Sequence, residues 1–176
     1  MPGLILVSPA LADARKIEEC RAEFSTGWTR VNYNPDRIPG LDGLESHPTV
    51  ADWLRYCDAM RGKISWFMTV RESDGRIVGF LCLRHRLAYD DDDDPEFCSH
   101  VGYSIRPSER GKGYAKEQLR LGLEKAKAIG LKKVRLICLD TNTGSQKTIL
   151  ANGGIFLDTL HGEESGLNVN RYDILL

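Results

Sequence analysis

The sequence predicts an α/β fold in which a mixed, mostly antiparallel central sheet of about seven strands is flanked by helices. Short apolar runs of strand length alternate with longer segments in which apolar residues recur at helical spacing. Two pairs of these runs are separated only by short turn-like segments, which favours antiparallel pairing. The 176 residues, 41% of them hydrophobic, suffice for one sizeable core. We therefore expect a single domain over residues 1–176, without repeats or a linker.

The N-terminal half supplies the first elements. Residues 4–7 are apolar and end at a Ser-Pro pair, which fits a strand. Residues 10–24 carry apolar side chains at helical spacing. Periodicity is lost over residues 25–48, which form either a surface meander or a segment that covers a substrate. Its apolar residues favour the second reading: Trp28, Tyr33, Ile38 and Leu41. Thr49 is suited to cap a short helix that continues to Met60.

The next two strands form a predicted hairpin. The runs Ile64–Arg71 and Arg76–Arg86 are joined by Glu72-Ser73-Asp74-Gly75, and Asp-Gly between such runs is a strong hairpin signal. Residues 77–83 are apolar throughout, which places the second strand in the middle of the sheet.

An acidic run follows the hairpin. Asp90–Asp94 are five consecutive aspartates, and Pro95-Glu96 comes next. Such a run is usually a solvated loop whose charges repel one another. Its place just before the next strand keeps a second interpretation open, in which it attracts a cationic amine.

The chain is organised around a glycine-rich turn between a strand, Phe97–Arg106, and a helix that runs to Ile129. The turn reads Arg110-Gly111-Lys112-Gly113-Tyr114-Ala115. Its glycines let main-chain N–H groups approach an anion, and the helix dipole favours phosphate. Basic side chains at Arg110, Lys112 and Lys116 add charge. The pattern predicts a pyrophosphate site, against the alternative of an ordinary flexible connection.

Two other phosphate motifs do not fit this turn. A Walker A loop requires Ser or Thr after the Gly-Lys pair, where this chain has Gly113. The dinucleotide fingerprint requires a third glycine, where this chain has Lys116. A general nucleotide-binding domain is therefore a weak third interpretation.

The remaining elements complete the predicted sheet. Lys133–Leu139 is apolar enough for a strand buried on both faces. A second helix begins at Asn142 or Thr143 and ends at Asn152-Gly153-Gly154. Residues 155–160 and 167–175 form a final strand pair.

Bulk properties exclude several classes of protein. The net charge of −1 and the pI of about 6.4 give no basis for nucleic-acid binding. The longest apolar run is too short to span a membrane, and the apolar N-terminus lacks signal-peptide features. No metal-ligand spacing occurs. The cysteines form no Cys-x-x-Cys pair, which indicates reduced thiols in a cytoplasmic protein: Cys20, Cys57, Cys82, Cys98 and Cys138.

Two motifs resemble the GNAT family of N-acetyltransferases. The first is Arg-x-x-Gly-x-Ala, with Arg110, Gly113 and Ala115 in the fixed places, and the second is the stretch 142–154. From His100 onward the order of elements is similar to that of the family. The second stretch is similar to the branch that acetylates ribosomal proteins and other N-terminal amines, and the end of the chain to a bacterial subgroup of predicted acetyltransferases. The resemblance implies the acyl-CoA N-acyltransferase fold and acetyl-CoA as co-substrate.

The resemblance also implies a set of cofactor-binding residues. Main-chain groups of the strand would pair with the pantetheine arm, those of the turn would hold the pyrophosphate, and the second helix would contact the arm from the other side. The residues are Tyr103, Ser104 and Ile105 on the strand, Arg110, Gly111, Lys112, Gly113, Tyr114 and Ala115 in the turn, and Asn142 and Ser145 on the helix. Plain helix capping is the alternative for Asn142 and Ser145.

The catalytic residues follow less directly. Many family members carry a tyrosine as general acid where this chain has Ile149, so Tyr103, Tyr114 and Tyr172 are substitutes among which the sequence does not choose. The candidate bases at the start of the key strand are His100 and Glu96. A hydrogen-bonded strand histidine and a member of the acidic loop are the respective alternatives. We carry His100, Glu96 and Tyr172 forward as the predicted catalytic set.

The function implied is acetyl transfer from acetyl-CoA to a primary amine of a small molecule or of a peptide or protein N-terminus, by direct attack in a ternary complex. The alternative is a non-catalytic acyl-CoA sensor or interaction module on the same fold. Neither nucleic acid nor a membrane is an expected partner, whereas a homodimer stays open.

Overall fold

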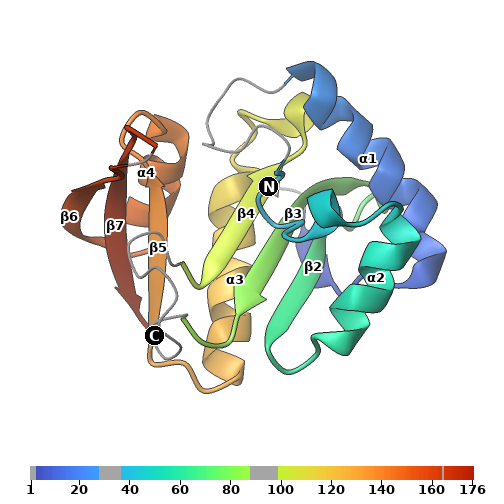
Figure 1. Ribbon diagram of the computed structural model, residues 1–176, viewed down its shortest axis with the longest axis horizontal. Coiled ribbons are helices and arrows are strands. Elements are labelled where there is room, and N and C mark those ends of the chain that lie inside the picture. Colours follow the sequence, from blue (N-terminus) through green and yellow to red (C-terminus); the bar gives the residue numbers. More distant parts are fainter. Residues whose placement is uncertain (1–2, 28–36, 88–98, 164) are drawn as a thin grey trace.

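The computed structural model describes residues 3–27, 37–87, 99–163 and 165–176 (Figure 1). Within these ranges seven strands form two antiparallel sheets, ordered β1-β2-β3-β4 and β5-β7-β6. The strands are β1 (Leu4–Val7), β2 (Ile64–Arg71), β3 (Ile77–Arg84), β4 (Val101–Ile105), β5 (Lys133–Leu139), β6 (Ile155–His161) and β7 (Asn168–Leu175). The α-helices are α1 (Ala14–Gly27), α2 (Val50–Ala59), α3 (Tyr114–Ala128) and α4 (Thr143–Leu150). The predicted mixed α/β class is confirmed.

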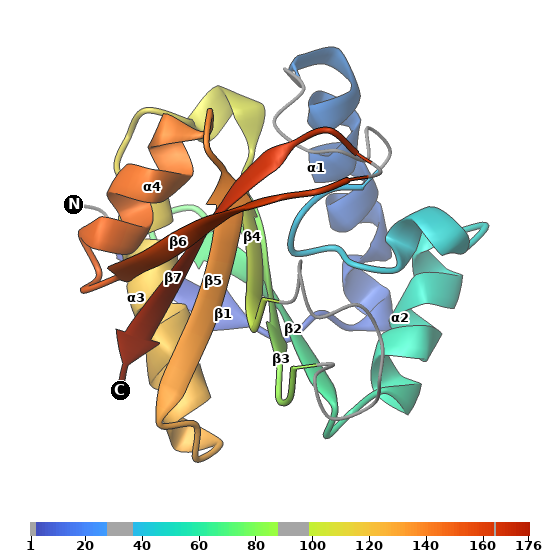
Figure 2. The same cartoon turned by 60° about the vertical axis from the view of Figure 1, so that its left-hand side comes forward.

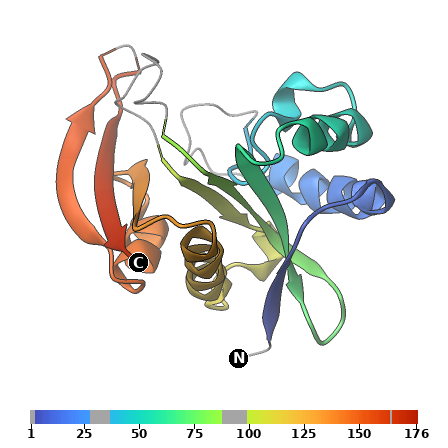
Figure 3. The same ribbon diagram turned by 90° about the horizontal axis from the view of Figure 1, so that it is seen from below.

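Helices cover both faces of the four-stranded sheet. Figure 3 shows α1 and α2 on one side of it and α3 on the other. Under α1 and α2, one apolar cluster packs around Trp53, Trp66 and Phe80. A second cluster, around Leu81, Leu119 and other residues, joins β3 and α3 to β5, β7 and α4. The second core therefore holds the two sheets together.

Local sequence signals account for most element boundaries. Thr49 caps α2, its hydroxyl accepting a 3.1 Å hydrogen bond from the main-chain N–H of Asp52. Gly75 turns the β2–β3 hairpin with a φ of 68°, and Gly130 follows α3 with a φ of 91°. The helix expected from residue 10 begins as a short 3₁₀ turn, Leu11–Asp13, before α1.

The expected single sheet is interrupted between β4 and β5. The two strands are linked where they start to diverge: the His100 N–H donates to the Arg135 carbonyl at 2.9 Å. In the described part of the chain β4 otherwise pairs with β3 alone, and β5 with β7. Figure 1 shows β4 and β5 spreading apart along their length, and Figure 2 shows the sheet of β5, β6 and β7 in front of β4. One edge of β4 is therefore left without a strand partner.

The described part of the predicted covering segment packs on the sheet. A Cβ at Gly40 would lie 2.5 Å from the Phe80 carbonyl carbon, so this glycine allows direct main-chain contact with β3. Leu41 and Leu44 are buried in the first core cluster. Of the four apolar residues named in that prediction, Ile38 also packs against this cluster, and Trp28 and Tyr33 lie outside the described residues. None of the helices in the described ranges is both long and apolar enough to cross a bilayer.

Candidate functional site

The main chain of β4 presents hydrogen-bonding groups along its unpaired edge. At its C-terminal end the Arg106 N–H donates to the Val78 carbonyl at 2.8 Å. The main-chain N–H and C=O groups of the even-numbered residues of β4 therefore point toward β3. Because this direction alternates along an antiparallel pair, the main-chain groups of Tyr103 and Ile105 face the opposite edge. There the Ile105 carbonyl accepts a 3.2 Å hydrogen bond from Arg110 Nε. The edge can therefore bind an extended ligand as a strand would.

Ser104 lies between these two residues and differs from them in orientation. By the same alternation its main-chain groups face β3, so it does not belong to the open edge. Its side-chain oxygen is buried and has no hydrogen-bond partner among the described residues.

The edge leads directly into the glycine turn. Pro107–Glu109 form a 3₁₀ turn, η5, and Gly111 and Gly113 then adopt φ values of 75° and 81°. Gly113 is the N-cap of α3, and none of the described side chains caps this helix. A Cβ at Gly111 would meet no atom within 4 Å. Exposed main-chain N–H groups at the positive end of a helix are suited to bind phosphate.

The basic side chains of the turn are engaged in contacts within the protein. Lys112 Nζ donates to the Glu109 carboxylate at 2.8 Å. The Arg110 guanidinium lies 5.9 Å from the centre of the Phe24 ring on α1. Lys116 is exposed on α3. An anion at this turn would therefore be held by main-chain amides and the helix dipole more than by converging side-chain charge.

Helix α4 faces β4 across the divergence. Asn142 Oδ1 accepts a 3.1 Å hydrogen bond from the Ser145 N–H, which is the capping contact that the sequence left open. The Ser145 hydroxyl lies 2.8 Å from the Tyr103 hydroxyl. The structure thus brings together Tyr103 and Ser145, two residues predicted from separate motifs.

The other positions weighed as general acids lie elsewhere. Ile149 follows Ser145 by one helical turn and is fully buried in the second core cluster. Tyr114 accepts a hydrogen bond from Arg71 at 3.2 Å, on the far side of the turn. Tyr172 is buried on β7, its hydroxyl 3.5 Å from Asn170 Nδ2. Of the three tyrosines, Tyr103 is the one whose hydroxyl links β4 to α4.

Burial keeps the bridging phenol protonated. The pKa of Tyr103 is raised, chiefly by burial, although hydrogen bonds with Ser145 and Thr148 act in the opposite direction. A protonated phenol that is hydrogen-bonded to a second hydroxyl can donate a proton and be reoriented by its neighbour.

His100 joins the two sheets. Its ring nitrogen Nδ1 accepts a 2.9 Å hydrogen bond from the Arg135 N–H, and its own N–H donates to the Arg135 carbonyl. Burial, helped by the Arg135 charge, lowers its pKa to about 4. At neutral pH the proton of this ring therefore sits on Nε2, since the Nδ1 lone pair is used.

We predict that His100 makes stability depend on pH. Its folded pKa lies below the unfolded value of about 6.5, so the unfolded state binds the extra proton and stability falls as pH drops from 6.5 toward 4. Between pH 6.5 and 4.5 we expect a loss of about 2 kcal/mol that is absent in His100→Gln. Urea unfolding at several pH values measures it. If the free energy of unfolding falls equally with pH in the wild type and in His100→Gln, His100 is not the cause of the pH dependence.

A buried ion-pair cluster around Asp42 was not found from the sequence. Asp42 forms ion pairs with Arg84 and Arg37 at 2.6 and 2.7 Å and accepts a hydrogen bond from the Cys82 thiol. It lies over β4, because a Cβ at Gly102 would be 3.3 Å from its carboxylate. The sequence signal here, Asp-Gly, indicated only a turn.

Some predicted features lie outside the described residues. Glu96 and the run Asp90–Asp94 belong to this group, so neither the candidate base nor the acidic run is placed. In the part of the chain that is described, no cluster of His, Cys, Asp or Glu is arranged to hold a metal ion. Cys20, Cys57, Cys82 and Cys138 are free thiols.

The comparison with protein families decides the family. The sequence profile described as "Acetyltransferase (GNAT) family" matches residues 26–153, well over half of the chain. The chain belongs to the GNAT family. The matched segment includes the edge of β4, the glycine turn and α4, so the site just described lies within the family's shared region. The sequence resemblance is thereby confirmed. A comparison with curated proteins gave no match.

Solved structures show the same fold for this GNAT protein. The microcin C7 self-immunity acetyltransferase MccE, in complex with acetyl-CoA and AMP, matches at 15% identity and a TM-score of 0.73, over 98% of this chain and 92% of that one. RimL, a ribosomal L7/L12 alpha-N-protein acetyltransferase in complex with coenzyme A, matches at 12% identity and a TM-score of 0.73, over 98% of this chain and 94% of that one. A Salmonella typhimurium acetyltransferase that modifies the N-terminal serine of L7/L12 matches at 14% identity and a TM-score of 0.70, over 98% of this chain and 95% of that one.

Proposed function

We propose that this GNAT protein is an acetyl-CoA-dependent N-acetyltransferase that acts on a primary amine of a small molecule or of a peptide or protein N-terminus. The observation that carries the proposal is the continuity of two binding surfaces. The edge of β4 that has no strand partner in the described part of the chain is followed, after the short turn η5, by the glycine turn at the start of α3. One surface suits an amide-containing arm and the next suits a diphosphate.

The residues of the site fit acetyl-CoA, which would supply the acyl group as an activated thioester. Main-chain N–H groups between Gly111 and Ala115 would hold the diphosphate. The main-chain groups of Tyr103 and Ile105 would pair with the pantetheine amides. A main-chain N–H directed at the thioester carbonyl polarises it, as in an oxyanion hole. Holding the donor in this way orients it for attack, which lowers the barrier without covalent chemistry by the protein.

A proton donor is available on the divergent strands. The hydroxyls of Tyr103 and Ser145 form one hydrogen-bonded pair between β4 and α4. We propose that this pair protonates the departing thiolate, in place of the tyrosine that Ile149 replaces. Tyr172 remains the second candidate, but its hydroxyl lies on β7 beside Asn170.

The attacking amine must lose a proton, because a lysine-like amine has a pKa near 10.4. Of the two candidate bases, His100 has its Nδ1 lone pair committed to Arg135 and carries its proton on Nε2. We therefore assign His100 to joining the sheets. Glu96 or a water molecule remains as the acceptor of the amine proton.

A second candidate function is a non-catalytic acyl-CoA sensor. The observations that favour it are the buried Ile149 at the usual acid position and the occupied ring nitrogen of His100. It shares the donor site with the enzyme and differs only in turnover.

One assay separates the two functions. Calorimetry with coenzyme A is expected to show binding, and free-thiol release from acetyl-CoA is expected to rise with at least one member of a panel of small amines and peptides with free N-termini. The product is identified by the mass gain of one acetyl group on the amine. If coenzyme A binds but no amine gives free-thiol release, the sensor function is favoured. If coenzyme A does not bind, both proposed functions are contradicted.

A further inference from the structure

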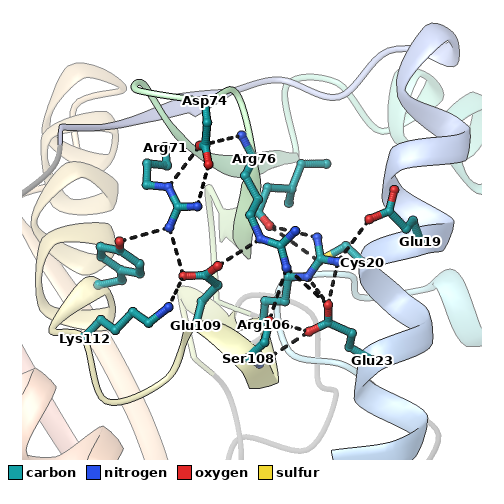
Figure 4. A network of polar contacts seen from close by, with 12 residues as sticks. Glu19, Cys20, Glu23, Arg71, Asp74, Arg76, Arg106, Ser108, Glu109 and Lys112 are labelled. Atoms are coloured by element: carbon teal, nitrogen blue, oxygen red, sulfur yellow. Dashed lines mark hydrogen bonds and ion pairs between the residues drawn. The ribbon is translucent and has the colours of Figure 1, made fainter.

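Arg71 connects the two ends of the glycine turn. Its Nη1 donates to the Glu109 carboxylate at 3.0 Å and to the Tyr114 hydroxyl at 3.2 Å. Glu109 is the last residue of η5 and Tyr114 is the first residue of α3. One guanidinium nitrogen on β2 therefore bridges the residues on either side of positions 110–113. Figure 4 shows this bridge.

The guanidinium is itself held in a fixed orientation. Its Nε and Nη2 donate to the two carboxylate oxygens of Asp74, at 3.0 and 2.6 Å. A paired contact of this kind sets the plane of the group as well as its position. The Arg71 side chain is 16% exposed and that of Glu109 is 6%, so water competes little for the Arg71–Glu109 contact, whereas the Asp74 side chain is 46% exposed.

Glu109 is the centre of the arrangement. It also accepts hydrogen bonds from Arg76 Nε at 2.9 Å and from Lys112 Nζ at 2.8 Å. Burial alone would raise its pKa, but the Lys112 hydrogen bond and the Arg71 charge outweigh burial and lower it. Glu109 therefore remains a carboxylate at neutral pH and keeps its cationic partners.

The other side of η5 is held by α1. Glu23 accepts hydrogen bonds from Arg106 Nε at 2.6 Å and from the Ser108 hydroxyl at 2.7 Å. The segment before the turn is thus fixed from two directions, whereas Tyr114, after the turn, contacts this network through Arg71. Arg71 therefore links Glu109, before the turn, to Tyr114, after it.

We propose that Arg71 is a positioning residue for diphosphate binding: by bridging Glu109 and Tyr114 it sets the separation of the two ends of the turn whose amides hold the donor. The inference rests on the proposed function. It goes beyond it because Arg71 acts through the side chains of Glu109 and Tyr114, and so through the shape of the turn, not through a contact of its own with the donor.

The test compares donors with and without a diphosphate. In Arg71→Met and Arg71→Lys, KM for acetyl-CoA and the calorimetric Kd for coenzyme A are expected to rise about tenfold, on the scale of a lost charge-assisted hydrogen bond. The kcat should stay within about twofold of the wild-type value. With S-acetyl-pantetheine, which lacks the diphosphate, kcat/KM should be unchanged. Lysine keeps the charge but lacks the fork, so it should not rescue binding.

Two further variants sharpen the result. Tyr114→Phe removes one end of the bridge while keeping a buried ring, and should raise Kd by about threefold. Arg55→Met is the matched control, because Arg55 pairs with Asp52 at 2.7 Å on α2 with the same three-residue spacing as Arg71 and Asp74. It should change nothing. Melting curves report whether each variant is folded.

The outcomes distinguish the inference from the proposed function. If the wild-type protein binds no coenzyme A, the proposed function fails. If it binds but both Arg71 variants retain the wild-type Kd, the inference fails alone. Equal losses with acetyl-CoA and S-acetyl-pantetheine would also overturn it, because they would indicate general damage to the fold. Calorimetry gives the answer even if the protein proves to be a sensor without turnover.

Discussion

Replacing Gly113 with valine is expected to lower kcat/KM for acetyl-CoA by about 100-fold or more, a loss typical of displacing a bound reactant by about 1 Å. Gly113 has a φ of 81° at the N-cap of α3. A β-branched residue is strained in this conformation, and its side chain would stand where main-chain amides meet the anion. The loss should appear mainly in KM and in the Kd for coenzyme A.

The matched control lies at the other end of the same helix. Gly130 has a φ of 91°, and a Cβ there would meet no atom within 4 Å. Gly130→Val introduces similar backbone strain far from the turn, so it should lower the melting temperature without changing Kd. If both valine variants bind coenzyme A equally well, the turn does not hold the diphosphate and the central premise of the proposed function is wrong.

The second large effect is expected from the Tyr103–Ser145 pair. Tyr103→Phe and Ser145→Ala should each lower kcat by about 100-fold, at the lower end of the range for general acid–base catalysis. Because the two hydroxyls act as one hydrogen-bonded unit, the double variant should lose little more than either single variant. The Kd for coenzyme A should change little, since the main chain of β4 and the glycine turn are intact.

Steady-state kinetics with acetyl-CoA and an accepted amine measure kcat for the wild type, the two single variants and the double variant. Thr159→Val is a suitable control, because Thr159 also forms a side-chain hydrogen bond, 2.7 Å to Asn170, but on the exposed surface of β6. Strict additivity of the two losses would show that the hydroxyls act independently. A loss in Tyr172→Phe that exceeds both single variants would transfer the acid role to Tyr172.

Much of the fold was predictable because local physical chemistry decides it. The Asp-Gly turn of the β2–β3 hairpin, the Thr49 cap and the period of α3 are each fixed by neighbours in the chain. The division of the strands into two sheets was not predictable in this way. It depends on His100 meeting Arg135 across 35 residues and on β4 lacking a second partner.

In the candidate site, too, some features follow from local sequence and others depend on the tertiary structure. The glycine turn and the Asn142 cap are short motifs, and their main-chain geometry follows from φ preferences and capping. The basic residues of the turn were expected to surround the anion. Instead Lys112 pairs with Glu109, because a buried carboxylate attracts any cation within reach.

The sequence by itself determined the fold class, the family and the position of the glycine turn, since these depend on periodicity and on motifs a few residues long. Only the tertiary structure decided which side chains meet: Tyr103 with Ser145, and Arg71 with residues 38 and 43 positions away. Contacts between elements depend on how the elements pack, and no local preference encodes that packing. For this reason the proposed proton donor and the proposed support of the turn became visible only in three dimensions.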